Sequence, residues 1–141
     1  DTRLLGLNLR LPEINAAIAT VQMKKLPKFL KTREKNAKLL SKLLSNLNLN
    51  LPQERKNENV NWYLYTVSTS KRNMLLKKLN AKGIGAASYY PIPVHKTPFY
   101  KSNTKLPITD WAASSVLSLP IHPKVTTKNI EFIAKTVLEV L

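Results

Sequence analysis

The sequence predicts an α+β fold in which helices pack on a small, largely antiparallel sheet. Apolar residues recur at helical spacing over the first third of the chain and again near its end. Between these regions, short runs rich in aromatic and β-branched residues alternate with helical segments. Such runs are few, so the sheet they build is small. A chain of 141 residues with a hydrophobic content of 43% suits one compact unit with a real core.

Two helices are expected at the amino-terminal end, with Pro27 between them. Pro12 and Glu13 open the first helix, because proline fits the first turn and a carboxylate there suits the helix dipole. Pro27 is expected to kink or break it, since the residue before a proline avoids the α region. The second helix is predicted from Pro27 to about Leu47. The two apolar faces are formed by Ile14, Ala17, Ile18 and Val21, and by Leu30, Ala37, Leu40, Leu44 and Leu47.

The middle of the chain carries the predicted strands. Residues 62–69 (WYLYTVST) form the clearest strand, and residues 49–51 and 84–90 are further candidates. Ser70 is expected to cap a helix that ends at Gly83, because glycine suits the left-handed conformation that follows many helices.

The last part of the chain is expected to be a loop followed by two helices. Residues 91–100 (PIPVHKTPFY) are too rich in proline for regular structure. A short helix is predicted over residues 109–116, followed by the segment SLPIHP. Thr127 is expected to cap the final helix. The apolar face of that helix is formed by Ile130, Ile133, Ala134, Val137, Leu138 and Leu141.

The formal charge of +15, from 23 basic and 8 acidic residues, raises the question of a polyanion partner. Lysines recur along one face of the second predicted helix: Lys28, Lys31, Lys35, Lys38 and Lys42. This stripe lacks the interleaved aromatic residues expected of single-strand binders, so we interpret it as a solvated face. We interpret the aromatic residues Trp62, Tyr63 and Tyr65 as packing residues. Nucleic acid is therefore not the expected partner, and a stand-alone basic module that binds nucleic acid or another polyanion is kept as the alternative function.

The composition also bears on the compartment. No apolar run approaches the roughly 20 residues that span a bilayer, and no signal-peptide pattern opens the sequence. The absence of cysteine excludes disulfides and zinc–thiolate sites. We therefore expect a cytoplasmic protein with no membrane partner and no metal site. The sequence begins at Asp1 rather than at a methionine, so a trimmed or processed piece is one interpretation.

Three motifs follow one another in the chain: GLNLRLPEINAAI at residues 6–18, YPIPVHKTPFY at residues 90–100, and SLPIHP at residues 118–123. They resemble the G-x-N-x-R-x-x-E-x-x-A-A, Y-P-x-P-x-H-x-x-P-x-Y and L-P-x-H-P segments of DegT/DnrJ-type sugar aminotransferases. Arg33 also stands where those enzymes carry an arginine. The resemblance covers nearly the whole chain, but only the carboxy-terminal part of the family's length.

This resemblance implies the small carboxy-terminal domain of an aspartate-aminotransferase-type (fold type I) enzyme that depends on pyridoxal 5'-phosphate. Residues 1–26 correspond by resemblance to the end of the cofactor-domain region with an interface helix, and residues 27–141 to the small domain. In the family, the Schiff-base lysine lies upstream of the G-x-N-x-R segment. Since no residue precedes Asp1 here, the chain alone is expected to be inactive, and no catalytic residue is assigned.

Two residues are candidates for binding the cofactor. By resemblance, Asn8 reaches across a dimer interface to the phosphate of the partner's cofactor, and its amide donates hydrogen bonds without adding charge. The other interpretation of Asn8 is a turn asparagine after Gly6. Arg10 either binds cofactor or substrate oxygens through its planar fork, or neutralises the helix start near Glu13. The resemblance thus implies a homodimer for the whole enzyme.

Two further residues are candidates for binding the substrate. In the family, the proline-rich loop lies near the active site, which implies contacts from Tyr90 and His95 to sugar hydroxyls or a nucleotide phosphate. A loop histidine bonded to backbone is the other interpretation of His95. His122 is expected instead to hold the turn before the last helix, because metal-ligating partners are absent nearby.

The implied reaction moves an amino group from an amino acid, often glutamate, to a keto-sugar attached to a nucleotide. Pyridoxal phosphate supplies the electron sink. The sequence names neither the sugar nor the amino donor. Some relatives keep the fold for dehydration or regulation, so these activities are alternatives within the family.

Overall fold

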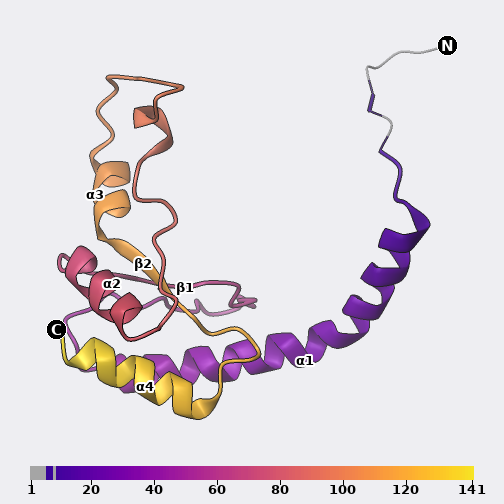
Figure 1. The fold of residues 1–141 in the computed structure, drawn as a ribbon, viewed down its shortest axis with the longest axis horizontal. Coiled ribbons are helices and arrows are strands. Elements are labelled where there is room, and N and C mark those ends of the chain that lie inside the picture. Colours follow the sequence, from indigo (N-terminus) through magenta and orange to yellow (C-terminus); the bar gives the residue numbers. More distant parts are fainter. Residues whose placement is uncertain (1–5, 8) are drawn as a thin grey trace.

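The computed structural model describes residues 6–7 and 9–141. The elements follow in the order α1 (Glu13–Leu44), β1 (Tyr65–Ser68), α2 (Arg72–Ala81), a 3-10 helix η1 (Val94–Lys96), α3 (Pro107–Ser115), β2 (Val116–Leu119) and α4 (Thr127–Leu138). Figure 1 shows the sheet, α2 and α4 gathered around one half of α1, whose other half extends away from them. Helices packed on a small antiparallel sheet confirm the predicted α+β class.

The prediction of two amino-terminal helices is wrong. The helix α1 begins at Glu13, as predicted, but it continues through Pro27 as one helix of 32 residues and ends at Leu44. Proline removes one backbone hydrogen bond and crowds the preceding turn, which bends a helix without necessarily ending it. Lysine and leucine are good helix formers and flank Pro27 on both sides, so the helix continues. In Figure 1, α1 curves and does not stop.

The sheet consists of β1 and β2, which run antiparallel with Tyr65 opposite Leu119 and Ser68 opposite Val116. The strand predicted at residues 62–69 is therefore present but shorter. Neither further candidate becomes a strand: residues 49–51 and 84–90 contribute one bridge each, Asn50 to Ser68 and Ala87 to Ser118.

The strand β2 is not predicted by the sequence, which indicates a helix over residues 109–116 and no regular element for the segment SLPIHP that follows. The helix α3 ends at Ser115, and the next four residues become a strand. Pairing with β1 buries Leu117 and Leu119 in the core. A strand this short has too little periodicity to be recognised in a sequence. Residues 116–119 form a strand because they pair with β1.

Helix ends follow the sequence in part. Gly83 has a φ of 75° directly after the C-cap Lys82, as predicted for a glycine that ends a helix. The expected cap at Ser70 is wrong, because Lys71 is the N-cap of α2 and no side chain caps it. Thr126, rather than Thr127, caps α4 in a reciprocal capping box with Asn129.

The core lies between the carboxy-terminal half of α1, the sheet, α2 and α4, with α4 packed along α1 (Figure 1). Its largest fully buried side chains include Tyr65, Leu40, Leu44, Leu75, Leu79, Leu117 and Ile130. Tyr65 shares a hydrogen bond of 2.7 Å with Ser41, and burial raises the pKa of its phenol. Asn36 is also buried and donates to the backbone oxygens of Ile121 (3.3 Å) and Val125 (3.0 Å). These two bonds attach the loop after β2 to α1.

Residues 89–115 form an arm that projects from the sheet and includes η1 and α3 (Figure 1). Residues 91–100 contain only the single turn η1 and are otherwise irregular, as predicted. The helix predicted at residues 109–116 is α3. The arm is rich in exposed apolar side chains: Tyr90, Ile92, Val94, Phe99, Tyr100, Ile108 and Trp111.

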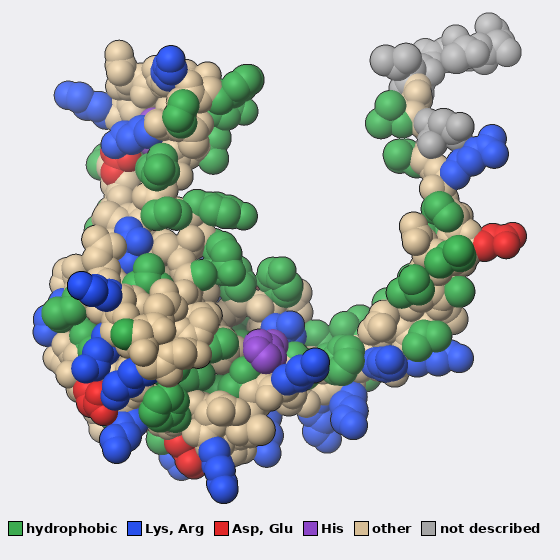
Figure 2. Space-filling view, viewed as in Figure 1, with side chains coloured by type: hydrophobic (Ala, Val, Ile, Leu, Met, Phe, Trp, Pro, Cys, Tyr) green, Lys and Arg blue, Asp and Glu red, His purple; other side chains and the backbone are tan. Residues whose placement is uncertain are grey.

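Charged and apolar residues divide the surface of α1. The five stripe lysines, Lys28, Lys31, Lys35, Lys38 and Lys42, are all exposed, so they share one outward face of the helix as their spacing predicts. Apolar side chains follow the amino-terminal half of the helix in Figure 2 and include Ile14, Ile18 and Val21. Over the described residues, no helix combines the length and apolar character needed to cross a membrane.

Candidate functional site

The candidate residues occupy two separate regions. Arg10 is exposed in the segment before α1, and Asn8 lies outside the described residues. Tyr90 and His95 belong to the arm. The segment before α1 and the arm lie at opposite ends of the molecule in Figure 1. One copy of the chain therefore does not bring Arg10 together with the candidate substrate residues.

The base of the arm is fixed to the core by backbone acceptors near β2. Ser88 Oγ donates to the carbonyl of Val116 (3.0 Å), and the N–H of Thr69 donates to the carbonyl of Ser115 (3.1 Å). Arg72 is buried at the start of α2 and donates from Nε and Nη2 to the carbonyls of Ser114 and Ala113, both at 2.9 Å. Charge-assisted bonds of this kind satisfy the last turn of α3, where helical carbonyls lack partners.

Within the arm, His95 and Tyr90 have different surroundings. Tyr90 is 72% exposed and contacts the ring of Tyr89 edge-on, with ring centroids 5.8 Å apart. The His95 side chain is only 12% exposed. Its Nε2 lies 3.8 Å from Oδ1 of Asp110, and that oxygen lies 2.6 Å from Nζ of Lys96. The sequence had suggested a histidine bonded to backbone as one interpretation, but the group that faces Nε2 is a carboxylate.

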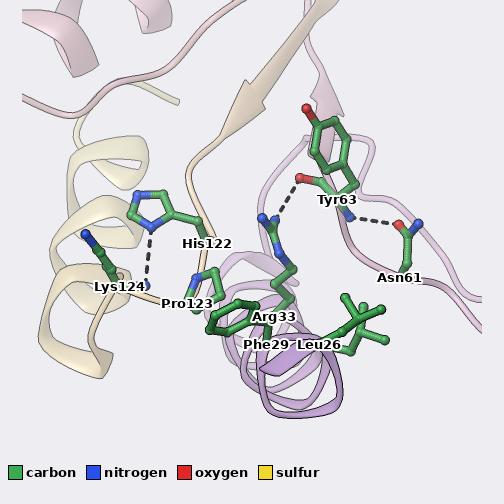
Figure 3. Close-up of a pocket in the computed structure, with 9 residues that line it drawn as sticks. Leu26, Phe29, Arg33, Asn61, Tyr63, His122, Pro123 and Lys124 are labelled. Atoms are coloured by element: carbon green, nitrogen blue, oxygen red, sulfur yellow. Dashed lines mark hydrogen bonds between the residues drawn. The ribbon is translucent and has the colours of Figure 1, made fainter. Parts of the chain in front are cut away.

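A groove opens between α1 and the loops that flank the sheet (Figure 3). It has a volume of about 440 Å³ and is lined by Leu26, Phe29, Leu30, Arg33, Asn61, Tyr63, His122, Pro123 and Lys124. Arg33 donates from Nη1 to the carbonyls of Tyr63 (3.0 Å) and Trp62 (3.2 Å), and its guanidinium lies 5.7 Å from the centre of the Tyr63 ring. A smaller hollow of about 200 Å³ shares Arg33, Tyr63 and His122 and reaches Tyr89 at the base of the arm.

Besides Arg33, the side chains of Asn61 and His122 in the groove are held by hydrogen bonds to backbone groups. Nδ1 of His122 accepts the N–H of Lys124 at 3.3 Å, so His122 holds the turn before α4 as predicted. The N–H of Tyr63 donates to the Asn61 side chain at 3.0 Å (Figure 3). None of the nine lining residues is acidic. The groove can therefore accept an anionic group whose attached apolar part contacts the wall.

Two residues that shape this region, Asp110 and Arg72, are not indicated by the sequence, and the contacts of a third, Arg33, are not either. Asp110 carried no signal beyond an acidic residue in the first turn of a helix, and only the fold places it against His95. Arg72 belongs to a helix with no acidic residue to suggest a partner, since it donates to backbone carbonyls. Arg33 was noted as the family's arginine, but its attachment to residues 62–63 is visible only in the structure.

Solved structures of sugar aminotransferases share this fold. DesV of S. venezuelae, in complex with a ketimine intermediate, matches with a TM-score of 0.87 and 31% identity over 92% of this chain and 36% of that one. A DegT/DnrJ/EryC1/StrS aminotransferase from Brucella abortus matches with a TM-score of 0.87 and 26% identity over 99% of this chain and 38% of that one. These likenesses define the class as the fold type I sugar aminotransferases.

The family follows from the sequence. The sequence pattern of the DegT/DnrJ/EryC1/StrS aminotransferase family matches residues 1–138, and the chain belongs to this family. It is 35% identical over 123 residues to the dTDP-3-amino-3,4,6-trideoxy-alpha-D-glucose transaminase of Streptomyces venezuelae, covering 84% of this chain and 32% of the relative. It is 31% identical over 142 residues to a pleiotropic regulatory protein of Geobacillus stearothermophilus, covering 96% of this chain and 38% of the relative.

The chain thus spans about a third of the length of the relatives it matches, between 32% and 38% for these two. These two relatives and two solved structures give no support to the alternative of a polyanion-binding module. The resemblance seen in the three motifs is confirmed.

Proposed function

We propose that this chain is the carboxy-terminal portion of a pyridoxal-phosphate-dependent aminotransferase that acts on nucleotide-linked keto-sugars. The observation that carries the proposal is the family match over residues 1–138, together with a fold that matches sugar aminotransferases along nearly its whole length. In this proposal the residues from 27 onward form the small domain, and the residues before Pro27 belong to the cofactor-domain region and its interface helix.

The family depends on pyridoxal phosphate, which supplies the electron sink for the transfer of the amino group when it is bound. The chemistry of the chain fits the phosphate end of this cofactor. Asn8 and Arg10 both offer N–H donors, and Arg10 is exposed ahead of α1. We assign these two residues to the phosphate. The distance between the segment before α1 and the arm supports a homodimer in which the segment serves the site of the other subunit.

We assign Tyr90 and His95 to the sugar nucleotide. Both lie on the arm, whose base the core holds through Ser88 and Arg72. A phenol and a neutral imidazole can each donate and accept hydrogen bonds, as sugar hydroxyls do. The groove beside Arg33 and His122 adds room for an anionic group and has no carboxylate in its lining.

A chimera tests the function. The carboxy-terminal third of the S. venezuelae transaminase is replaced by this chain, and cofactor absorbance and amino transfer to that enzyme's sugar nucleotide are measured. We expect the chimera to retain the cofactor and to turn over, whereas the 141-residue chain alone shows no turnover above free cofactor. A soluble, folded chimera that holds no cofactor would contradict the proposal.

Asn8→Ala in the chimera tests the cofactor assignment. Loss of one hydrogen bond to a charged group is expected to cost about 1.5–3 kcal/mol of cofactor binding, because the phosphate oxygen loses a donor. Asn15→Ala is the matched control, since Asn15 is an exposed asparagine on α1. Equal cofactor affinity in the two variants would remove Asn8 from the site.

The regulatory relative keeps a second function open within the family. The likeness to the Geobacillus stearothermophilus protein covers 96% of this chain, as complete a match as that to the enzymes. Turnover by the chimera supports the aminotransferase. Cofactor retention without turnover, in a chimera whose parent is active, favours the regulatory function.

A further inference from the structure

Nε2 of His95 is buried and lacks a hydrogen-bond partner among the described residues. A buried polar nitrogen in this state is costly unless a partner stands within reach. The group that faces it is the carboxylate of Asp110, at 3.8 Å from Nε2 to Oδ1. This distance is about 1 Å too long for a hydrogen bond, and hydrogen bonds at catalytic sites are often long before a ligand closes them.

We propose that Asp110 is a positioning residue for His95: its carboxylate accepts Nε2–H and so leaves Nδ1 of the imidazole as a hydrogen-bond acceptor for substrate. The sugar-binding part of this proposal rests on the function proposed above. The orientation of the imidazole by Asp110 does not depend on that function and can be tested without it.

A neutral imidazole carries one donor and one acceptor nitrogen, and the partner of one nitrogen decides the state of the other. A carboxylate can only accept, so it selects the tautomer with hydrogen on Nε2. Because Nε2 is fully buried, the 12% exposure of the side chain belongs to other ring atoms. With hydrogen on Nε2, Nδ1 carries a lone pair, and an acceptor nitrogen of this kind suits a sugar hydroxyl.

Nζ of Lys96 lies 2.6 Å from the same carboxylate oxygen, so an ion pair stands beside the imidazole. Hydrogen bonds hold the chain on both sides of the pair. The carbonyl of His95 accepts the N–H of Ser102 at 2.9 Å. At the other end, Arg72 holds the last turn of α3, and Asp110 stands in its first turn.

Nitrogen NMR of the ¹⁵N-labelled 141-residue chain tests the proposal. The chain has two histidines, His95 and His122. Spectra are recorded at a high pH, at which the ring nitrogen shifts no longer change with pH. His122 is an internal reference, since its Nδ1 accepts the N–H of Lys124. We expect His95 to show two widely separated ring nitrogen shifts, with the proton on Nε2.

Two variants distinguish positioning from a merely structural ion pair. In Asp110→Ala, the two His95 shifts should move toward each other, as in a mixture of tautomers, while those of His122 stay in place. Lys96→Met removes the ion pair but keeps the carboxylate, so the His95 separation should persist or widen. Glu131→Ala on α4 is the control for removal of an exposed carboxylate. Backbone amide spectra check that each variant folds.

An unchanged His95 separation in a folded Asp110→Ala chain would overturn the proposal. So would a collapse of the separation in Lys96→Met equal to that in Asp110→Ala, because the ion pair alone would then explain both. Asp110→Leu, which is of similar shape and offers no acceptor, replaces Asp110→Ala if the alanine variant does not fold. Sugar-nucleotide binding by a His95→Asn chimera is measured separately. Unchanged binding there contradicts the substrate role of His95 without touching its orientation by Asp110.

Discussion

The two halves of α1 follow one amphipathic pattern, but the fold uses them differently. In the carboxy-terminal half, Leu40 and Leu44 are fully buried between the sheet and α4. In the amino-terminal half, Ile14 is 74% exposed and Ile18 is 56% exposed. A contiguous apolar stripe of this kind on a helix is typical of a surface that another unit covers. The difference teaches that helical periodicity identifies the apolar face, whereas the tertiary structure decides which part of that face belongs to this core.

The largest expected effect comes from truncating one leucine in the buried half. Leu40→Ala should lower the free energy of unfolding by about 2–5 kcal/mol, because it removes buried methylene groups and leaves a cavity. Ile18→Ala is the matched change in the exposed half and should stay within about 0.5 kcal/mol. Urea denaturation of the chain measures both. Equal destabilisation by the two variants would show that the halves do not differ in packing.

The second contrast uses two asparagines on the same helix. Asn36→Ala leaves the carbonyls of Ile121 and Val125 without their donor and should cost about 1–3 kcal/mol, because buried acceptors then lack a hydrogen bond. Asn15→Ala, in the exposed half, should be neutral or slightly stabilising, since alanine is the better helix former. Thermal unfolding of the two variants measures the difference. A stable Asn36→Ala chain would mean that water replaces the lost donor.

The third prediction concerns how stability depends on pH at the end of α4, the helix that packs on the buried half of α1. Glu139, just after α4, bonds to Lys82, just after α2. The hydrogen bond from Lys82 holds the pKa of the Glu139 carboxyl below its ordinary value. A depressed carboxyl pKa stabilises the fold above the unfolded-state value, and the contribution is lost as the pH falls through the folded-state value.

Unfolding temperatures of the wild type should therefore fall more steeply at acidic pH than those of Glu139→Gln. Both groups are partly exposed, with side-chain exposures of 30% for Lys82 and 37% for Glu139, so the effect is small and screened by salt. Glu131→Gln is the control, because Glu131 is an exposed carboxylate on the same helix. Identical pH profiles for wild type and Glu139→Gln would contradict the role of this pair.

The smallest effect on global stability is expected at the junction of the halves. Pro27→Ala restores the missing backbone N–H, which is locally worth about 3 kcal/mol in a helix interior. Amide hydrogen exchange should slow in residues 13–30, whereas the midpoint of urea unfolding should hardly move, because this half lies outside the core. Pro12→Ala at the N-cap is the control. A clear rise in the global midpoint would show that the exposed half is coupled to the core.

Some elements could be read from the sequence because their information is local. The signals for α4, a threonine pair at its start and an apolar face at helical spacing, lie within a few turns of the chain. Gly83 follows the end of α2 because glycine tolerates a positive φ. The three motifs led to the family on residue identity and order. The assignment of Asn8, Arg10, Tyr90 and His95 to a site stays a prediction, because a binding role depends on groups that are distant in the chain or belong to another molecule.

What the sequence by itself determined is therefore the family, the α+β class and most helix positions, since these depend on neighbouring residues and on motif identity. The tertiary structure decided three things. It merged two expected helices into α1 across Pro27, it made β2 a strand because β1 pairs with it, and it set Asp110 against His95. The strand β2 and the approach of Asp110 to His95 depend on groups that are distant in the chain. The continuity of α1 depends on the balance between the hydrogen bond lost at Pro27 and the stability of the helix around it. Local periodicity carries no information about such partners, because only the folded chain brings them into contact.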